Sequence, residues 1–119
     1  MSNNEKPPIP DRAGMDAIDR LTSHLEEHRQ RDPQVSRTAR LFRMGRARLA
    51  EKVGEEAIEI AIEAVRGDRT AVLQESADLV YNLAALWVDL GIRPEEVWAE
   101  MARREARYGI AEKLRKDDR

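Results

Sequence analysis

No cysteine occurs among the 119 residues of the sequence. This absence excludes a disulfide framework and any metal site built on thiolates, and it is typical of the reducing cytoplasm, where we expect this protein. The sequence also lacks a run of about eighteen apolar residues, the length that a membrane-spanning helix needs. No apolar stretch near its start resembles a signal peptide. We therefore expect neither a membrane anchor nor secretion.

Aromatic residues are also scarce, at 4% of the chain, which is too few for the stacking platforms that single-stranded nucleic-acid binders use. The 21 basic and 23 acidic residues leave a net charge of -2, so no excess of one sign points to nucleic acid or to an anionic membrane. The composition therefore predicts no nucleic-acid partner and no membrane partner.

What the sequence does contain is helix-forming residues, chiefly Ala, Glu, Arg and Leu. No segment alternates apolar and polar residues as a strand would, so the pattern predicts an all-α helical bundle. Three prolines among polar residues mark 1–13 as a disordered or loosely attached tail. Residues 14–119 are then expected to form a single domain, which suits a chain with 41% hydrophobic residues.

Capping signals and apolar periodicity predict four helices. The first covers 15–29, and the second runs from an N-capping serine over 36–66, with a break or kink near Gly45 as an open alternative. The third covers 70–91, and the fourth begins with Pro94 in its first turn. Side chains at helical spacings are expected to pack in the core, whereas the histidine pair of the first helix is read as exposed. The expected core side chains are Met44, Trp87, Val97, Trp98, Met101 and Ala102, and the expected exposed pair is His24 and His28.

Two acidic pairs stand out on the second and third predicted helices. Glu56/Glu59 and Glu75/Asp78 are each spaced i,i+3, which places the two members on one helix face about 5 to 6 Å apart at Cβ. Both pairs lie roughly 9 to 12 Å along their helices from the turn at 67–69, so an antiparallel hairpin brings them to one level. A hard cation such as Mg²⁺, or alternatively Mn²⁺, would neutralise such a cluster. A solvated acidic face explains the spacing about as well.

The stretch Lys-Val-Gly-Glu-Glu-Ala-Ile-Glu at 52–59, followed by Glu-Ser-Ala-Asp-Leu-Val-Tyr at 75–81, resembles the signature of the all-α nucleotide pyrophosphatases with the MazG-like fold. Within that superfamily it is most similar to the phosphoribosyl-ATP pyrophosphatases. Residues 109–113 also resemble the C-terminal motif of this family. The resemblance implies magnesium-dependent hydrolysis of phosphoribosyl-ATP to phosphoribosyl-AMP and pyrophosphate in histidine biosynthesis. The partner it implies is a small-molecule nucleotide.

The resemblance also implies roles for individual residues. The metal ligands would be Glu56, Glu59, Glu75 and Asp78, while Glu55 is a fifth acid that touches a second ion, orients the attacking water or is merely solvated. The substrate-binding candidates are Lys52, Asn82, Lys113 and Arg115. Arginines recur every third residue from Arg37 to Arg46, and they either reach phosphates or form a solvated basic face.

Three positions depart from the family pattern, namely Arg37, Asn82 and Tyr108, and an N-terminal extension is added. These departures leave open a MazG-type house-cleaning nucleoside triphosphate pyrophosphatase, and also a non-catalytic helical interaction module. The second and third predicted helices are each apolar over about 200° of their circumference, more than two short flanking helices readily cover. We therefore expect a homodimer or a larger homo-oligomer.

Overall fold

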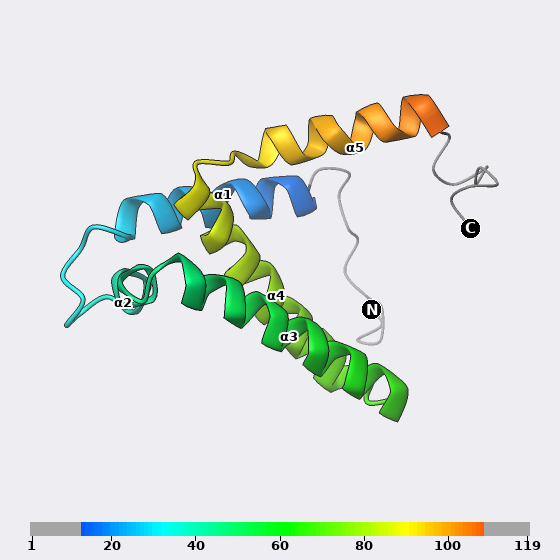
Figure 1. The fold of residues 1–119 in the computed structure, drawn as a ribbon, viewed down its shortest axis with the longest axis horizontal. Coiled ribbons are helices and arrows are strands. Elements are labelled where there is room, and N and C mark those ends of the chain that lie inside the picture. Colours follow the sequence, from blue (N-terminus) through cyan, green and yellow to red (C-terminus); the bar gives the residue numbers. More distant parts are fainter. Residues whose placement is uncertain (1–12, 109–119) are drawn as a thin grey trace, which may run out of the picture.

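The computed structural model describes residues 13–108, and within them all regular structure is helical (Figure 1). The five helices are α1 (Ala13–His28), α2 (Arg37–Arg43), α3 (Arg46–Arg66), α4 (Arg69–Leu90) and α5 (Pro94–Tyr108). Helices α3 and α4 form a long antiparallel hairpin, and α1 and α5 lie side by side across one end of it (Figure 1). The predicted all-α fold is confirmed. Among the described residues, no helix is both long and apolar enough to cross a membrane.

Helix boundaries follow from local backbone chemistry. Ser36 caps α2 by accepting a hydrogen bond from the backbone N–H of Ala39. Gly45 then adopts a φ of 89°, a region that favours glycine, and this breaks the predicted helix 36–66 into α2 and α3. Gly67, at φ 79°, ends α3 in the left-handed conformation and starts the turn into α4. The expectation of a break near Gly45 is therefore the correct one of the two alternatives.

The core lies where α1, α2, α3 and α4 meet. Its largest fully buried side chains are Leu25 of α1 and Leu49 of α3. The other buried hydrophobic side chains that pack with these two are Leu41, Ala84, Ala85 and Val88. Trp87 and Trp98 meet edge to face with their ring centroids 6.1 Å apart, which attaches α5 to α4. The predicted packing of both tryptophans is therefore confirmed.

Three other predicted core positions are wrong. Met44 is 51% exposed because it lies in the bend between α2 and α3, outside the packed faces of both helices. Met101 is 54% exposed, and Ala102 is exposed as well. Helix α5 borders mainly α1, so only a narrow seam near its start is covered. Val97 and Trp98 lie on that seam and are half-buried.

An ion-pair network joins the elements around the core. Asp89 of α4 receives a hydrogen bond from Arg46 Nε at 2.7 Å and lies 3.9 Å from the guanidinium of Arg29. Arg29 also donates to the backbone oxygen of Val88 at 3.3 Å and covers the ring of Phe42. The Asp89 side chain is only 17% exposed, so water replaces these partners poorly. The network therefore fixes α1 and the start of α3 against the end of α4.

The Asp89→Asn substitution is expected to lower the free energy of unfolding by about 1 to 2 kcal/mol, because it removes the charge that both guanidinium groups face. Urea denaturation followed by circular dichroism measures this change. Glu51→Gln is the matched control, since Glu51 pairs with Arg48 at 3.1 Å and its side chain is 66% exposed. Equal unfolding midpoints for the two variants would show that the network contributes nothing to stability.

Candidate active site

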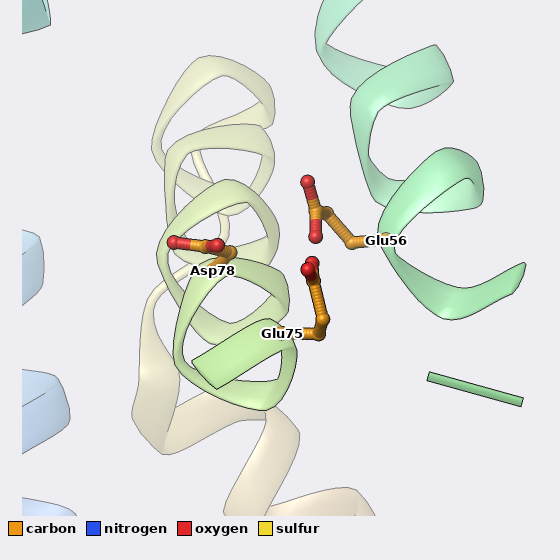
Figure 2. A group of neighbouring side chains, drawn as sticks. All are labelled: Glu56, Glu75 and Asp78. Atoms are coloured by element: carbon orange, nitrogen blue, oxygen red, sulfur yellow. The ribbon is translucent and has the colours of Figure 1, made fainter. Parts of the chain in front are cut away.

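Three carboxylates from α3 and α4 converge in the hairpin. Glu56, Glu75 and Asp78 each offer one oxygen, and these oxygens lie within 4.8 Å of one another. The carboxylates of Glu56 and Glu75 face each other between the two helices, and Asp78 projects from the next turn of α4 (Figure 2). We call these three residues the acidic cluster. They are three of the four metal ligands expected from the sequence.

Glu59, the fourth expected ligand, lies beside the acidic cluster. Its pKa is raised, first by a hydrogen bond shared with Glu75 and then by the negative charge of Glu75. The pKa of Glu75 is raised in turn, chiefly by a hydrogen bond with Glu56, against a smaller opposite effect from Glu59. Carboxylates share hydrogen bonds only when one of them holds a proton. Without a cation, Glu59 and Glu75 therefore take up protons at a higher pH than an ordinary glutamate does.

The donor set fits a hard divalent cation. Glu56 Oε2 is buried and has no hydrogen-bond partner among residues 13–108. A buried carboxylate oxygen without a donor is costly, and the neighbouring groups are acceptors like itself. Several oxygens and no nitrogen or sulfur ligands are what Mg²⁺ and Mn²⁺ prefer. The acidic cluster thus offers the right atoms for such an ion, with Glu59 in reach of Glu75.

Glu55 lies apart from this group. Its Oε2 accepts a hydrogen bond from Arg48 at 3.0 Å, and its side chain is 55% exposed. The pKa of Arg48 is raised by its hydrogen bonds to Glu55 and Glu51. Glu55 acts on Glu59 only through its charge. Any contact between Glu55 and a second ion or a water molecule would require it to turn away from Arg48.

A cavity of about 880 Å³ opens beside the acidic cluster and takes in two of its members, Glu56 and Asp78. Two expected substrate-binding residues, Lys52 and Asn82, line the same cavity. Asn82 is buried, one turn beyond Asp78 on α4. The other two expected contacts, Lys113 and Arg115, lie outside the described residues.

Helices α1 and α2 and the segment between them supply most of the remaining cavity wall. His24 and His28, read as exposed from the sequence, both line it, and their rings stack with centroids 4.0 Å apart. That reading is wrong for His28, which is half-buried at the end of α1, where the packing of α1 against α4 brings it to the cavity. Thr38 and Tyr81 also line the cavity and join α2 to α4 by a hydrogen bond of 3.1 Å between their hydroxyls. Sequence reasoning missed this pair, although Tyr81 closes the second acidic motif.

Comparisons with known proteins agree on one family. The family model described as phosphoribosyl-ATP pyrophosphohydrolase matches residues 18–105. A protein of Rhodopseudomonas palustris named phosphoribosyl-ATP pyrophosphatase 2 is 57% identical over 85% of this chain and 77% of its own length. The protein of the same name from Bradyrhizobium diazoefficiens is 55% identical, over 85% of this chain and 75% of its own length. A phosphoribosyl-ATP pyrophosphatase of Azospirillum brasilense is 50% identical over 87% of this chain and 93% of its own length.

Proposed function

Because this chain belongs to the phosphoribosyl-ATP pyrophosphohydrolase family, we propose that it hydrolyses phosphoribosyl-ATP to phosphoribosyl-AMP and pyrophosphate in histidine biosynthesis. The structural observation that carries the proposal is the position of the acidic cluster at the wall of a cavity large enough for a nucleotide. A nucleotide substrate also suits the cytoplasmic location expected from the sequence.

The acidic cluster, with Glu59 beside it, is proposed to hold Mg²⁺. A bound Mg²⁺ would neutralise triphosphate oxygens and lower the pKa of the attacking water. In the overall reaction, one water molecule is consumed, the bond between the α-phosphorus and the oxygen that bridges it to the β-phosphate breaks, and pyrophosphate leaves. The protein's part is to fix the position of the carboxylates, which the packing of α3 against α4 does.

Two polar side chains of the cavity are proposed to position the substrate. The ammonium group of Lys52 lies one turn before Glu56 on α3 and attracts phosphate oxygens next to the acidic cluster. Asn82 is buried beside the same cavity, so its amide offers a hydrogen bond to the substrate or to a ligand carboxylate. Neither side chain has a hydrogen bond or ion pair with another described residue, which leaves both available for a ligand.

Pyrophosphate release from phosphoribosyl-ATP, measured beside a panel of nucleoside triphosphates with Mg²⁺ present, tests this function. We expect kcat/KM to be highest for phosphoribosyl-ATP. A MazG-type house-cleaning enzyme would use the same ligands, so only the order of substrates separates the two activities. A nucleoside triphosphate preferred over phosphoribosyl-ATP would assign the chain to that second activity.

The hairpin also supports the proposal that the protein is a homodimer. Apolar side chains lie exposed along α3 with helical spacing: Ile58 is 62%, Ile62 46% and Val65 90% exposed. Leu73 and Val80 add exposed apolar surface on α4. No other described helix packs appreciably against the end of the hairpin where α3 turns into α4 (Figure 1). Burying such a stripe against a second copy removes it from water.

Light scattering at micromolar concentration is expected to give at least twice the mass of one chain. Ile58→Glu places a charge in the stripe and is expected to shift the protein toward monomer. Met101→Glu is the matched control, because Met101 is similarly exposed, at 54%, but lies on α5. A wild-type protein with the mass of a single chain would refute the dimer.

A further inference from the structure

The cavity has walls of opposite charge, built by different helices. Glu56 and Asp78 come from α3 and α4. The side contributed by α1, α2 and the segment between them carries three arginines and two histidines, which we call the basic wall. The basic wall consists of Arg31, Arg37, Arg40, His24 and His28. A ligand that fits both walls must carry two separate negative groups. One group faces the basic wall directly, and the other faces the acidic wall through a bound cation.

Among the three arginines of the basic wall, only one has no side-chain hydrogen bond or ion pair with a described residue. Arg31 pairs with Glu27 at 3.0 Å, and Arg40 donates to the backbone oxygen of Pro33 at 2.7 Å. The Arg37 side chain has no hydrogen bond or ion pair with any residue in 13–108. A free guanidinium group at a cavity wall is suited to bind a phosphate through two parallel hydrogen bonds. Arg37 is therefore the arginine of the basic wall most available to bind an anion.

An anion bound by Arg37 need not be the triphosphate. The reacting phosphates must lie at the acidic cluster, where Lys52 already supplies a cation from α3. Arg37 lies on another helix, on the far side of Gly45 in the chain, and faces the cavity from the α2 side. An ordinary nucleoside triphosphate carries phosphates at one end only. Phosphoribosyl-ATP carries a further phosphate on its second ribose, at the other end of the purine.

We propose that the basic wall is a second phosphate subsite, in which Arg37 binds the 5′-phosphate of the phosphoribosyl group and thereby selects phosphoribosyl-ATP over nucleoside triphosphates. This inference rests on the proposed function. The cavity volume of about 880 Å³ lies near the upper end of the usual range for ligand pockets, which gives room for both ribose phosphates. Arg37 is thus a specificity-determining residue of this chain, at one of the positions where its sequence departs from the family pattern.

Steady-state kinetics of Arg37→Ala test the subsite. The variant is expected to lower kcat/KM for phosphoribosyl-ATP by roughly ten- to a hundredfold, mostly through KM, because a charge-assisted phosphate contact is lost while the acidic cluster is untouched. Ribose 5-phosphate is the probe for the subsite alone. It should inhibit the wild-type enzyme competitively and inhibit Arg37→Ala more weakly by a similar factor. Arg37→Lys should recover part of both effects.

Two controls separate the possible outcomes. Arg43→Ala changes the same residue type on the same helix outside the cavity lining. It should leave both kcat/KM for phosphoribosyl-ATP and the inhibition constant of ribose 5-phosphate unchanged. ATP, added as a competitor, should have the same inhibition constant for wild type and Arg37→Ala. Weaker inhibition of Arg37→Ala by ATP would show that Arg37 binds the triphosphate, and this would overturn the proposal. Unchanged kinetics of the variant with phosphoribosyl-ATP would overturn it as well. Failure of the proposed function is seen separately, as no pyrophosphate release by the wild type.

Discussion

Asp78→Asn is expected to lower the turnover of phosphoribosyl-ATP by about a hundredfold or more while the fold persists. The substitution keeps the shape of the side chain and removes a charge that would balance the proposed cation. Asp78 is exposed, so an acid of a merely solvated face at this position would tolerate the change with little effect on stability or activity. The two accounts therefore differ by two orders of magnitude in one assay.

Stability gives a second, independent result for the same variant. Without metal, Asp78→Asn relieves repulsion in the acidic cluster, so its melting temperature should equal or exceed that of the wild type. On adding Mg²⁺, the rise in melting temperature should be smaller than in the wild type, because the ion binds more weakly. Asp19→Asn is the matched control, since Asp19 is exposed on α1, away from the cluster. Near-normal turnover of Asp78→Asn, together with a full Mg²⁺-dependent rise in its melting temperature, would show that Asp78 is not a metal ligand.

Withdrawing the metal is expected to abolish turnover. Excess chelator should stop pyrophosphate release, and adding Mg²⁺ or Mn²⁺ beyond the chelator should restore it. The physical reason is that the carboxylates repel the substrate's phosphates unless a cation lies between them. Full turnover in excess chelator would contradict the cation site.

The chelated protein is also expected to lose stability as the pH rises. The pKa values of Glu59 and Glu75 are raised above 4.5 in the folded protein, so the folded state binds more protons than the unfolded state over that window. The stabilisation that the raised pKa values give to the folded state is fully present below about pH 4.5. It is lost as the pH rises through the pKa values of the folded protein. Melting temperatures measured from pH 4.5 upward in chelator should therefore include this decline, and Glu75→Gln should weaken it. An identical pH dependence for that variant would show that the cluster does not couple to stability.

The level at which the acids meet was predictable from the sequence. Counting residues from the turn at 67–69 places Glu59 and Glu75 at about one height in an antiparallel hairpin, roughly 9 to 12 Å from the turn, and in the structure these two side chains share a hydrogen bond. This worked because the geometry depends only on helix rise and one short turn. The stop signal at Gly67 is a local feature, and local features are read directly from sequence.

The basic wall could not be predicted in the same way. Its position depends on the break at Gly45, which turns α2 out of line with α3. It also depends on the packing of α1 against α4, which brings His28 to the cavity. The exposure of Met101 has a similar origin, since the apolar periodicity of α5 does not reveal how much of its surface a neighbouring helix covers. These are tertiary effects, to which periodicity and capping signals are blind.

Phosphorus NMR of phosphoribosyl-ATP incubated with the protein and Mg²⁺ tests the central claim most directly, because it identifies the bond that breaks. The account predicts phosphoribosyl-AMP and pyrophosphate in equal amounts, with neither formed when excess chelator is present. Orthophosphate with phosphoribosyl-ADP, or substrate that remains intact, would contradict it.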